Sequence, residues 1–165
     1  MIAIDAFDPE RDLLFERVVQ LPRRLIWKAW TEPETLMKWF CPRPWETVSC
    51  QIDLWPGGRF ATVMRSPEGI EVAGAHSYLV VEPESRLIWT SALTAGFRPH
   101  AQPTSDTDFV FTVALTFSDE AGGTRYRAHV MHATPKARQR HEDMGFQEGW
   151  STALDQLVEA MAGQV

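Results

Sequence analysis

Apolar residues recur at helical spacing near the C-terminus. Between positions 141 and 161 they stand at 146, 150, 153, 154, 157, 158 and 161, in steps of three and four. Polar residues occupy the other positions, namely Gln147, Glu148, Asp155, Gln156 and Glu159. This pattern predicts a long amphipathic helix over 141–161, at the end of a helical region that Pro135 opens. A helix with so broad an apolar face needs a sheet to pack against.

Most of the preceding chain alternates between apolar and polar residues, which is the period of a strand. The alternation predicts strands over 13–20, 47–53, 58–64, 70–81, 86–93, 109–117 and 124–132. Two short helices are expected after the first strand, one over 23–30 and one that contains Leu36, Met37, Trp39 and Phe40. Tight turns such as Trp55-Pro-Gly-Gly join consecutive strands, which indicates antiparallel pairing. The predicted fold class is α+β, with a curved antiparallel sheet of about six or seven strands.

Composition and charge narrow the function classes. The chain has 165 residues, a net charge of −6 and a sequence pI of about 5.3, so one domain over 1–165 is expected. Nucleic acid is not an expected partner, because phosphate binding requires a concentrated basic patch. There is no apolar run long enough for a membrane span and no secretory signal at the start. A cytoplasmic location without membrane binding is therefore the default expectation.

Few residues suggest catalytic or metal chemistry. Cys41 and Cys50 lack the spacing of a zinc site, and we expect them to be free thiols. Motifs for a nucleophilic serine, a phosphate-binding loop, a dinucleotide or a helical zinc site are absent. His129 and His132 stand three apart on a strand and must point to opposite faces. No metal and no cofactor are expected, although a pair drawn from His76, His132, His141 and Glu142 would change this if the fold joined them.

Three stretches together resemble a known family. They are Trp27-Lys-Ala-Trp-Thr-Glu-Pro-Glu-Thr-Leu-Met-Lys-Trp-Phe, Asp53-Leu-Trp-Pro-Gly-Gly-Arg-Phe and Met144-Gly-Phe-Gln-Glu-Gly-Trp-Ser-Thr-Ala-Leu-Asp-Gln-Leu. With Gly74, Tyr78 and Pro83-Glu-Ser-Arg-Leu between them, they resemble the SRPBCC (START-like, birch-pollen-allergen-like) superfamily over about 13–161. The similar branch is the one named after the activator of a heat-shock-protein ATPase. The resemblance implies a helix-grip fold, in which the sheet wraps around the C-terminal helix and a cavity between them often holds an apolar ligand. The eukaryotic activators carry a separate chaperone-binding domain that this chain has no room for, so chaperone binding is not expected.

The aromatic residues supply the candidate site. Some, including Trp27, Trp30, Trp39, Phe40 and Trp45, gather around the two short helices, and others fall where they can line the space under the long helix. The candidate ligand-binding residues are Tyr78, Trp89, Phe109, Phe111, Tyr126, His132, Met144, Phe146 and Trp150. Gly145 and Gly149 stand four apart on the predicted helix, where glycine costs about 1 kcal/mol relative to alanine. They predict either close approach to a strand or room for a ligand.

Three functions are consistent with these patterns. The first is binding of a small apolar or aromatic molecule between the sheet and the C-terminal helix. The second is a cyclase-like or hydrolase-like enzyme that uses the same cavity, with His132 or His76 as the ionisable group. The third is an interaction module, either a co-chaperone-like domain or a homodimerising one, in which exposed aromatic residues such as Trp45 or Trp55 form a patch. The loop over 94–107 is long enough to act as a lid.

Overall fold

Seven strands form one antiparallel sheet in the computed structural model, which describes residues 3–101 and 109–165. The strands of this sheet are β1 (Asp12–Val19), β2 (Glu46–Ile52), β3 (Arg59–Arg65), β4 (Glu71–Glu82), β5 (Arg86–Thr90), β8 (Phe111–Glu120) and β9 (Gly123–His132). A separate small hairpin consists of β6 (Leu93–Thr94) and β7 (Arg98–Pro99). The helices are α1 (Arg23–Thr31), α2 (Pro33–Leu36), α3 (Pro135–Asp143) and α4 (Phe146–Met161), followed by a 3-10 turn at Ala162–Gln164.

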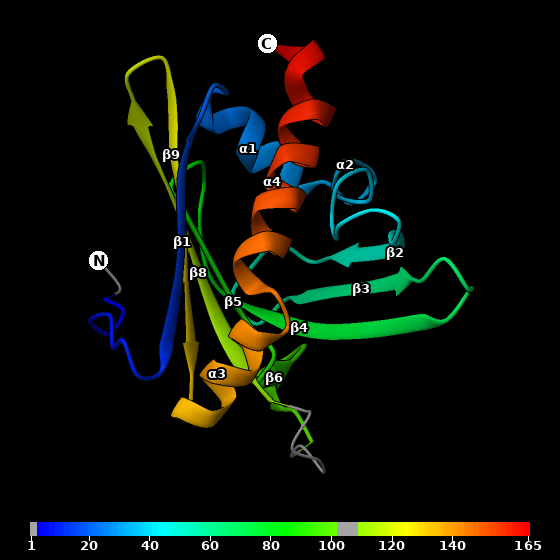
Figure 1. Cartoon of the computed structure of the whole chain (residues 1–165), viewed down its shortest axis with the longest axis vertical. Coiled ribbons are helices and arrows are strands. Elements are labelled where there is room, and N and C mark those ends of the chain that lie inside the picture. Colours follow the sequence, from blue (N-terminus) through cyan, green and yellow to red (C-terminus); the bar gives the residue numbers. More distant parts are fainter. Residues whose placement is uncertain (1–2, 102–108) are drawn as a thin grey trace.

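The sheet curves around α4. Its order is β1-β9-β8-β5-β4-β3-β2, and every neighbouring pair is antiparallel. Figure 1 shows β1, β8 and β9 following the long axis of the molecule, whereas β2, β3 and β4 run across it. The register shifts between Thr47 and Ser49 in β2 and between Tyr78 and Val80 in β4. Such bulges bend a strand and increase its twist. The predicted α+β helix-grip arrangement is confirmed.

The main core fills the space between the concave face of the sheet and the helices. In β8 the alternate residues Val113, Leu115 and Phe117 face this core and are at most 3% exposed. From the other side α4 buries its apolar face, and α1 adds four buried residues near the C-terminal end of α4. The buried residues of these two helices are Phe146, Leu154, Gln156, Leu157 and Met161 in α4, and Leu25, Ile26, Ala29 and Trp30 in α1.

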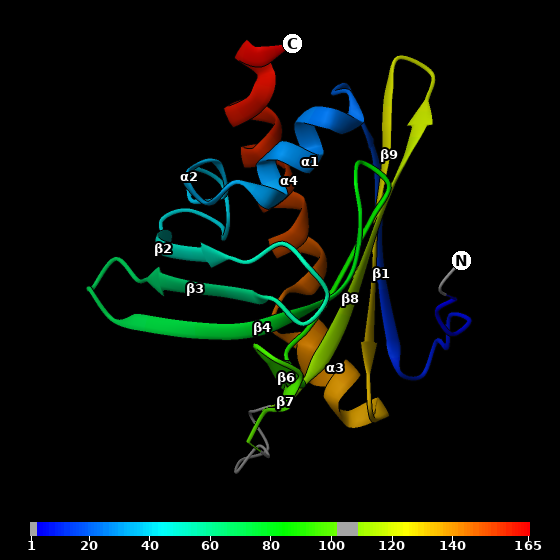
Figure 2. The same cartoon turned by 180° about the vertical axis from the view of Figure 1, so that it is seen from behind.

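The predicted C-terminal helix is wrong in one respect, because it is broken into α3 and α4. Gly145 adopts φ +87°, a left-handed conformation that favours glycine, and its N–H donates to the carbonyl of Glu142 at 3.0 Å. Figures 1 and 2 both show α3 turned away from the axis of α4 at the end of the sheet where β9 stops. The break places His141 in α3 and leaves Met144 exposed at the turn.

The second short helix is also shorter than predicted, and a buried side chain of α4 holds the turn that follows it. It ends at Leu36, so Trp39 and Phe40 lie in the turn that follows. Gln156 of α4 donates from its side-chain nitrogen to the carbonyl oxygens of Trp39 and Cys41, both at 2.9 Å, and accepts from the N–H of Arg43 at 2.9 Å. The sequence pattern placed Gln156 on the polar face, but it is buried and ties this turn to α4.

Strand ends around the predicted loop differ as well. The strand predicted over 86–93 ends at Thr90, and the strand predicted over 109–117 begins at Phe111. Between these two ends the Ser91 hydroxyl, rather than a backbone carbonyl, accepts from the Phe111 N–H at 2.9 Å. Part of the predicted 94–107 loop is the β6–β7 hairpin, which Figure 2 shows near α3. Positions 102–108 lie outside the described residues, so the lid remains a prediction.

Candidate functional site

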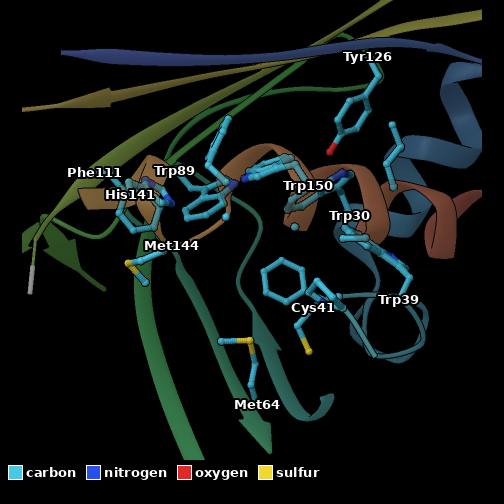
Figure 3. A pocket seen from close by; sticks show the side chains of 17 residues that line it. Trp30, Trp39, Cys41, Met64, Trp89, Phe111, Tyr126, His141, Met144 and Trp150 are labelled. Atoms are coloured by element: carbon cyan, nitrogen blue, oxygen red, sulfur yellow. The ribbon is translucent and has the colours of Figure 1, made fainter. Parts of the chain in front are cut away.

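A pocket of about 380 Å³ lies between the concave face of the sheet and α4. Figure 3 shows its labelled side chains converging from the sheet, from the turn after α2 and from α4. It is lined by Trp30, Trp39, Phe40, Cys41, Pro42, Met64, Trp89, Phe111, Tyr126, His141, Met144, Gly145, Phe146, Gly149, Trp150, Ala153 and Leu154. No Lys, Arg, Asp or Glu belongs to this lining within residues 3–101 and 109–165, so the walls are mainly aromatic and aliphatic.

Six of the nine candidate residues line this pocket, and three do not. The six are Trp89, Phe111, Tyr126, Met144, Phe146 and Trp150. Tyr78 is fully buried and stacked on Phe60, with ring centroids 5.5 Å apart. Phe109 and His132 both lie behind His141, with ring centroids 5.0 and 5.1 Å from that imidazole. The alternation of the strands therefore identified the correct face but not the depth of each side chain.

Four of the lining residues that the candidate set lacks come from the turn after α2. Trp39, Phe40, Cys41 and Pro42 reach the pocket because Gln156 holds the carbonyls of Trp39 and Cys41 against α4. Inside this wall Trp39 packs edge-on against Trp30 at 4.9 Å. The gathering of aromatic residues around the two short helices was the available signal. It did not show that a single buried glutamine would draw the turn over the groove.

The two glycines of the C-terminal region have different roles. Gly149 lines the pocket, and no atom lies within 4 Å of the position that a Cβ would occupy there, so close approach to a strand is not its role. Gly145 also has open space, but its φ of +87° makes it the turn residue between α3 and α4. Of the two interpretations of Gly149, the structure therefore supports open space in the pocket.

His141 and His132 form a hydrogen-bonded pair at one end of the pocket. Nδ1 of His132 lies 2.8 Å from the carbonyl oxygen of Arg11, and Nε2 of His132 lies 2.8 Å from Nδ1 of His141. Since a carbonyl only accepts, Nδ1 of His132 carries hydrogen, and in the neutral ring Nε2 must accept. Nδ1 of His141 then donates, so Nε2 of His141 bears a lone pair. Among the described residues this nitrogen has no hydrogen-bond partner.

Burial keeps both imidazoles neutral at pH 7. Burial lowers the pKa of His141 to about 4, and the neighbouring His132 adds a smaller effect in the same direction. Burial also lowers the pKa of His132, although its hydrogen bond to Arg11 offsets part of the shift. Tyr126 stays protonated because burial raises its pKa far above the usual value. The polar atoms of the pocket are therefore uncharged.

Neither thiol is suited to act as a metal ligand or nucleophile at neutral pH. Burial raises the pKa of Cys50 to about 11, and it raises the pKa of Cys41 although the Thr47 hydroxyl offsets part of the effect. Over the chain outside positions 1–2 and 102–108, no three His, Cys, Asp or Glu residues are close enough to hold a metal ion. His132 and His141 are thus a pair without a third ligand.

A second depression, of about 460 Å³, lies on the other side of the Trp39–Cys41 turn. Charged residues at its rim include Arg43 and Glu159, which form an exposed ion pair at 3.0 Å. The exposed Trp45 and Trp55 lie beyond opposite ends of β2, a strand of seven residues or roughly 23 Å, so they do not form one patch. Of these two, the pocket under α4 is the better candidate site, because it combines apolar walls with a polar group directed inward.

A family model described as activator of Hsp90 ATPase homolog 1-like protein matches residues 20–162. The chain belongs to this family. The SRPBCC resemblance is thereby confirmed, whereas the match says nothing about the contents of the pocket. Among curated proteins, none matches the chain. Within the described part of the chain, no helix is both long and apolar enough to cross a membrane.

Solved structures share the whole fold of the family. A protein from Nitrosomonas europaea is 44% identical, with 96% of this chain and 98% of that chain covered and a TM-score of 0.90. A protein from Rhodobacter sphaeroides is 25% identical, with 93% and 94% covered and a TM-score of 0.80. The AHSA1-like protein from Aeromonas hydrophila is 19% identical, with 93% of each chain covered and a TM-score of 0.68, which supports the fold alone.

Proposed function

We propose that the protein binds a small apolar or aromatic molecule in the pocket between the sheet and α4. The observation that carries the proposal is a pocket of about 380 Å³ whose described lining has no charged side chain. Pockets for small molecules have volumes of roughly 300–1,000 Å³ and mainly apolar walls with a few polar groups. A volume near the lower limit suits a molecule of one or two rings.

An enzyme that uses the same pocket is the weaker alternative. Its ionisable group would be His141, because His132 lies behind it and does not line the pocket. An efficient general base has a pKa near the working pH, and burial instead lowers the pKa of His141 to about 4. A neutral imidazole of this kind is better suited to accepting a hydrogen bond than to removing a proton from carbon.

The test is a binding titration with 2-methylnaphthalene as a neutral probe. Four of the seven tryptophans line the pocket, so an occupant will change the intrinsic fluorescence. Gly149→Leu places a side chain in the open space and is expected to weaken binding at least tenfold. Thr152→Leu, which adds a similar side chain to an exposed position of the same helix, should leave affinity unchanged. Absence of binding to the wild type, or equal binding to both variants, contradicts the proposal.

Native mass spectrometry of freshly purified protein provides an independent test. A mass adduct that is lost on denaturation supports a resident ligand, and its mass narrows the chemical class. The same spectrum distinguishes a monomer from the homodimer that the sequence allows. An adduct that persists in Gly149→Leu would place that ligand outside the pocket and contradict its assignment to this site.

A further inference from the structure

At one end of the pocket, ring contacts and a hydrogen bond hold the imidazole of His141 in one orientation. Figure 3 shows His141 beside Phe111, with Met144 at the same end. The rings of Phe109, Phe111 and Phe146 surround the imidazole with centroid distances of 5.0, 5.0 and 5.2 Å. Together with the hydrogen bond to His132, these contacts fix the orientation of the ring.

The backbone that carries His141 is anchored independently of the pocket. After β9 ends at His132, Thr134 caps α3 by accepting from the N–H of Ala137 at 3.1 Å. On the same helix Arg138 donates to the carbonyl of Asp12 at 3.3 Å and pairs with Glu142. The helix thus returns over the end of β9 and places His141 against His132, nine residues earlier in the chain.

This arrangement determines which hydrogen-bonding role His141 offers to the pocket. The Arg11 carbonyl accepts from the backbone N–H of His132 at 3.1 Å as well as from its Nδ1 at 2.8 Å, which fixes the His132 tautomer. His141 must then donate through Nδ1, which leaves Nε2 as a pure acceptor. This acceptor lies at the pocket without a partner among the described residues, so a ligand that donates to it completes the hydrogen bonding of the imidazole.

We propose that the pocket selects a neutral aromatic molecule that carries a hydroxyl group, and that this hydroxyl donates a hydrogen bond to Nε2 of His141. The inference rests on the proposed function and assigns the ligand class to the same site. A carboxylate is disfavoured for two reasons. It has no proton to donate, and no cationic side chain lines the described pocket to compensate its desolvation.

The test compares three ligands that differ in one substituent: 2-naphthol, 2-methylnaphthalene and 2-naphthoate at pH 7. The wild type should bind 2-naphthol about tenfold more tightly than 2-methylnaphthalene, which corresponds to one good hydrogen bond. It should bind 2-naphthoate most weakly. The inference is overturned, while the proposed function survives, if 2-methylnaphthalene binds as well as 2-naphthol or if the carboxylate binds best. If none of the three binds, the proposed function fails and the inference fails with it.

Two substitutions of His141 separate its role in selection from a structural role. Asparagine can still donate to His132 from the position of Nδ1 but has no atom at Nε2, so His141→Asn should lose the tenfold preference for the hydroxyl. Glutamine reaches the position of Nε2 with an amide that can accept, so His141→Gln should retain part of the preference. Equal preference in wild type and His141→Asn, with both proteins folded by circular dichroism, would overturn the inference.

The nitrogen resonances of the imidazole report the contact directly. In a long-range proton–nitrogen spectrum of the free wild type, Nε2 of His141 should appear unprotonated and Nδ1 protonated. Addition of 2-naphthol should shift the Nε2 resonance, and 2-methylnaphthalene should shift it much less. A protonated Nε2 in the free protein would remove the acceptor on which the inference depends.

Discussion

Two histidines on β9, His129 and His132, stand three residues apart and lie in hydrogen-bond networks on opposite faces of the sheet. On the outer face, Nε2 of His129 lies 2.8 Å from a carboxylate oxygen of Asp12, which also accepts from the N–H of Asp8 at 2.9 Å. Phe7 packs on this pair, and its ring centroid lies 5.6 Å from that of His129. On the inner face, His132 leads through His141 to an acceptor that faces the pocket. The first network is closed among protein groups, whereas the second ends at the acceptor to which we propose that the ligand binds.

Removal of Asp12 tests the closed network and should have the largest effect on stability. Asp12→Ala leaves the buried His129 and the N–H of Asp8 without their acceptor, so we expect a loss of about 3 kcal/mol in the free energy of unfolding. Urea denaturation measures this loss, and Asp5→Ala at an exposed position is the control, expected within about 0.5 kcal/mol of the wild type. The preference for 2-naphthol should be unchanged in the folded fraction. A loss of that preference would show that the two networks are coupled.

The helix break tests the support of the open network. Gly145→Ala forces a side chain into a left-handed conformation at φ +87°, which costs about 1–2 kcal/mol, and it disturbs the turn that holds His141. Gly149→Ala is the matched control, since helical alanine is favoured by about 1 kcal/mol and open space receives the methyl group. The two substitutions should therefore shift the thermal midpoint in opposite directions. Shifts of the same sign would contradict the assigned roles of the two glycines.

The sequence predicted much of the fold, because strand alternation and helical spacing depend on local residue order. It placed β8 and β9 within two residues of their observed starts, and it placed His129 and His132 on opposite faces. It failed where a single residue overrode the local pattern. At Gly145 the backbone turns into a left-handed conformation and ends the helix. The spacing of the apolar residues does not change there, so the hydrophobic pattern gives no sign of the break.

The sequence predicted which side of the sheet the candidate residues occupy, but not which residues they contact there. Spacing shows that His132 points toward the helix, but the residue that meets it depends on where α3 returns after β9. The turn after α2 was missed for a similar reason, since Gln156 has the spacing of a polar surface position and yet is buried against Trp39 and Cys41. Both features are contacts between segments far apart in the chain, which one sequence does not reveal.

The pH dependence of stability provides the finest test of the inner face. The pKa of His141 is about 4 in the folded protein and about 6.5 when unfolded, so the unfolded chain binds more protons between these values. Stability is therefore fully present above pH 6.5 and falls as the pH drops toward 4. Burial lowers the pKa of His76 to about 4 as well, so it contributes in the same direction. Each group can add at most about 1.4 kcal/mol per pH unit.

Urea denaturation at pH 7.5, 6.5 and 5.5 measures this dependence in wild type and in His141→Asn. The variant lacks one of the three histidines whose pKa burial lowers, so its stability should fall less steeply over the range. Thr152→Leu changes no titratable group and should keep the wild-type slope. If His141→Asn also keeps that slope, the imidazole is as well solvated in the folded protein as in the unfolded chain. The pocket end at His141 would then be open to water, and a hydroxyl on a ligand would gain little by replacing it.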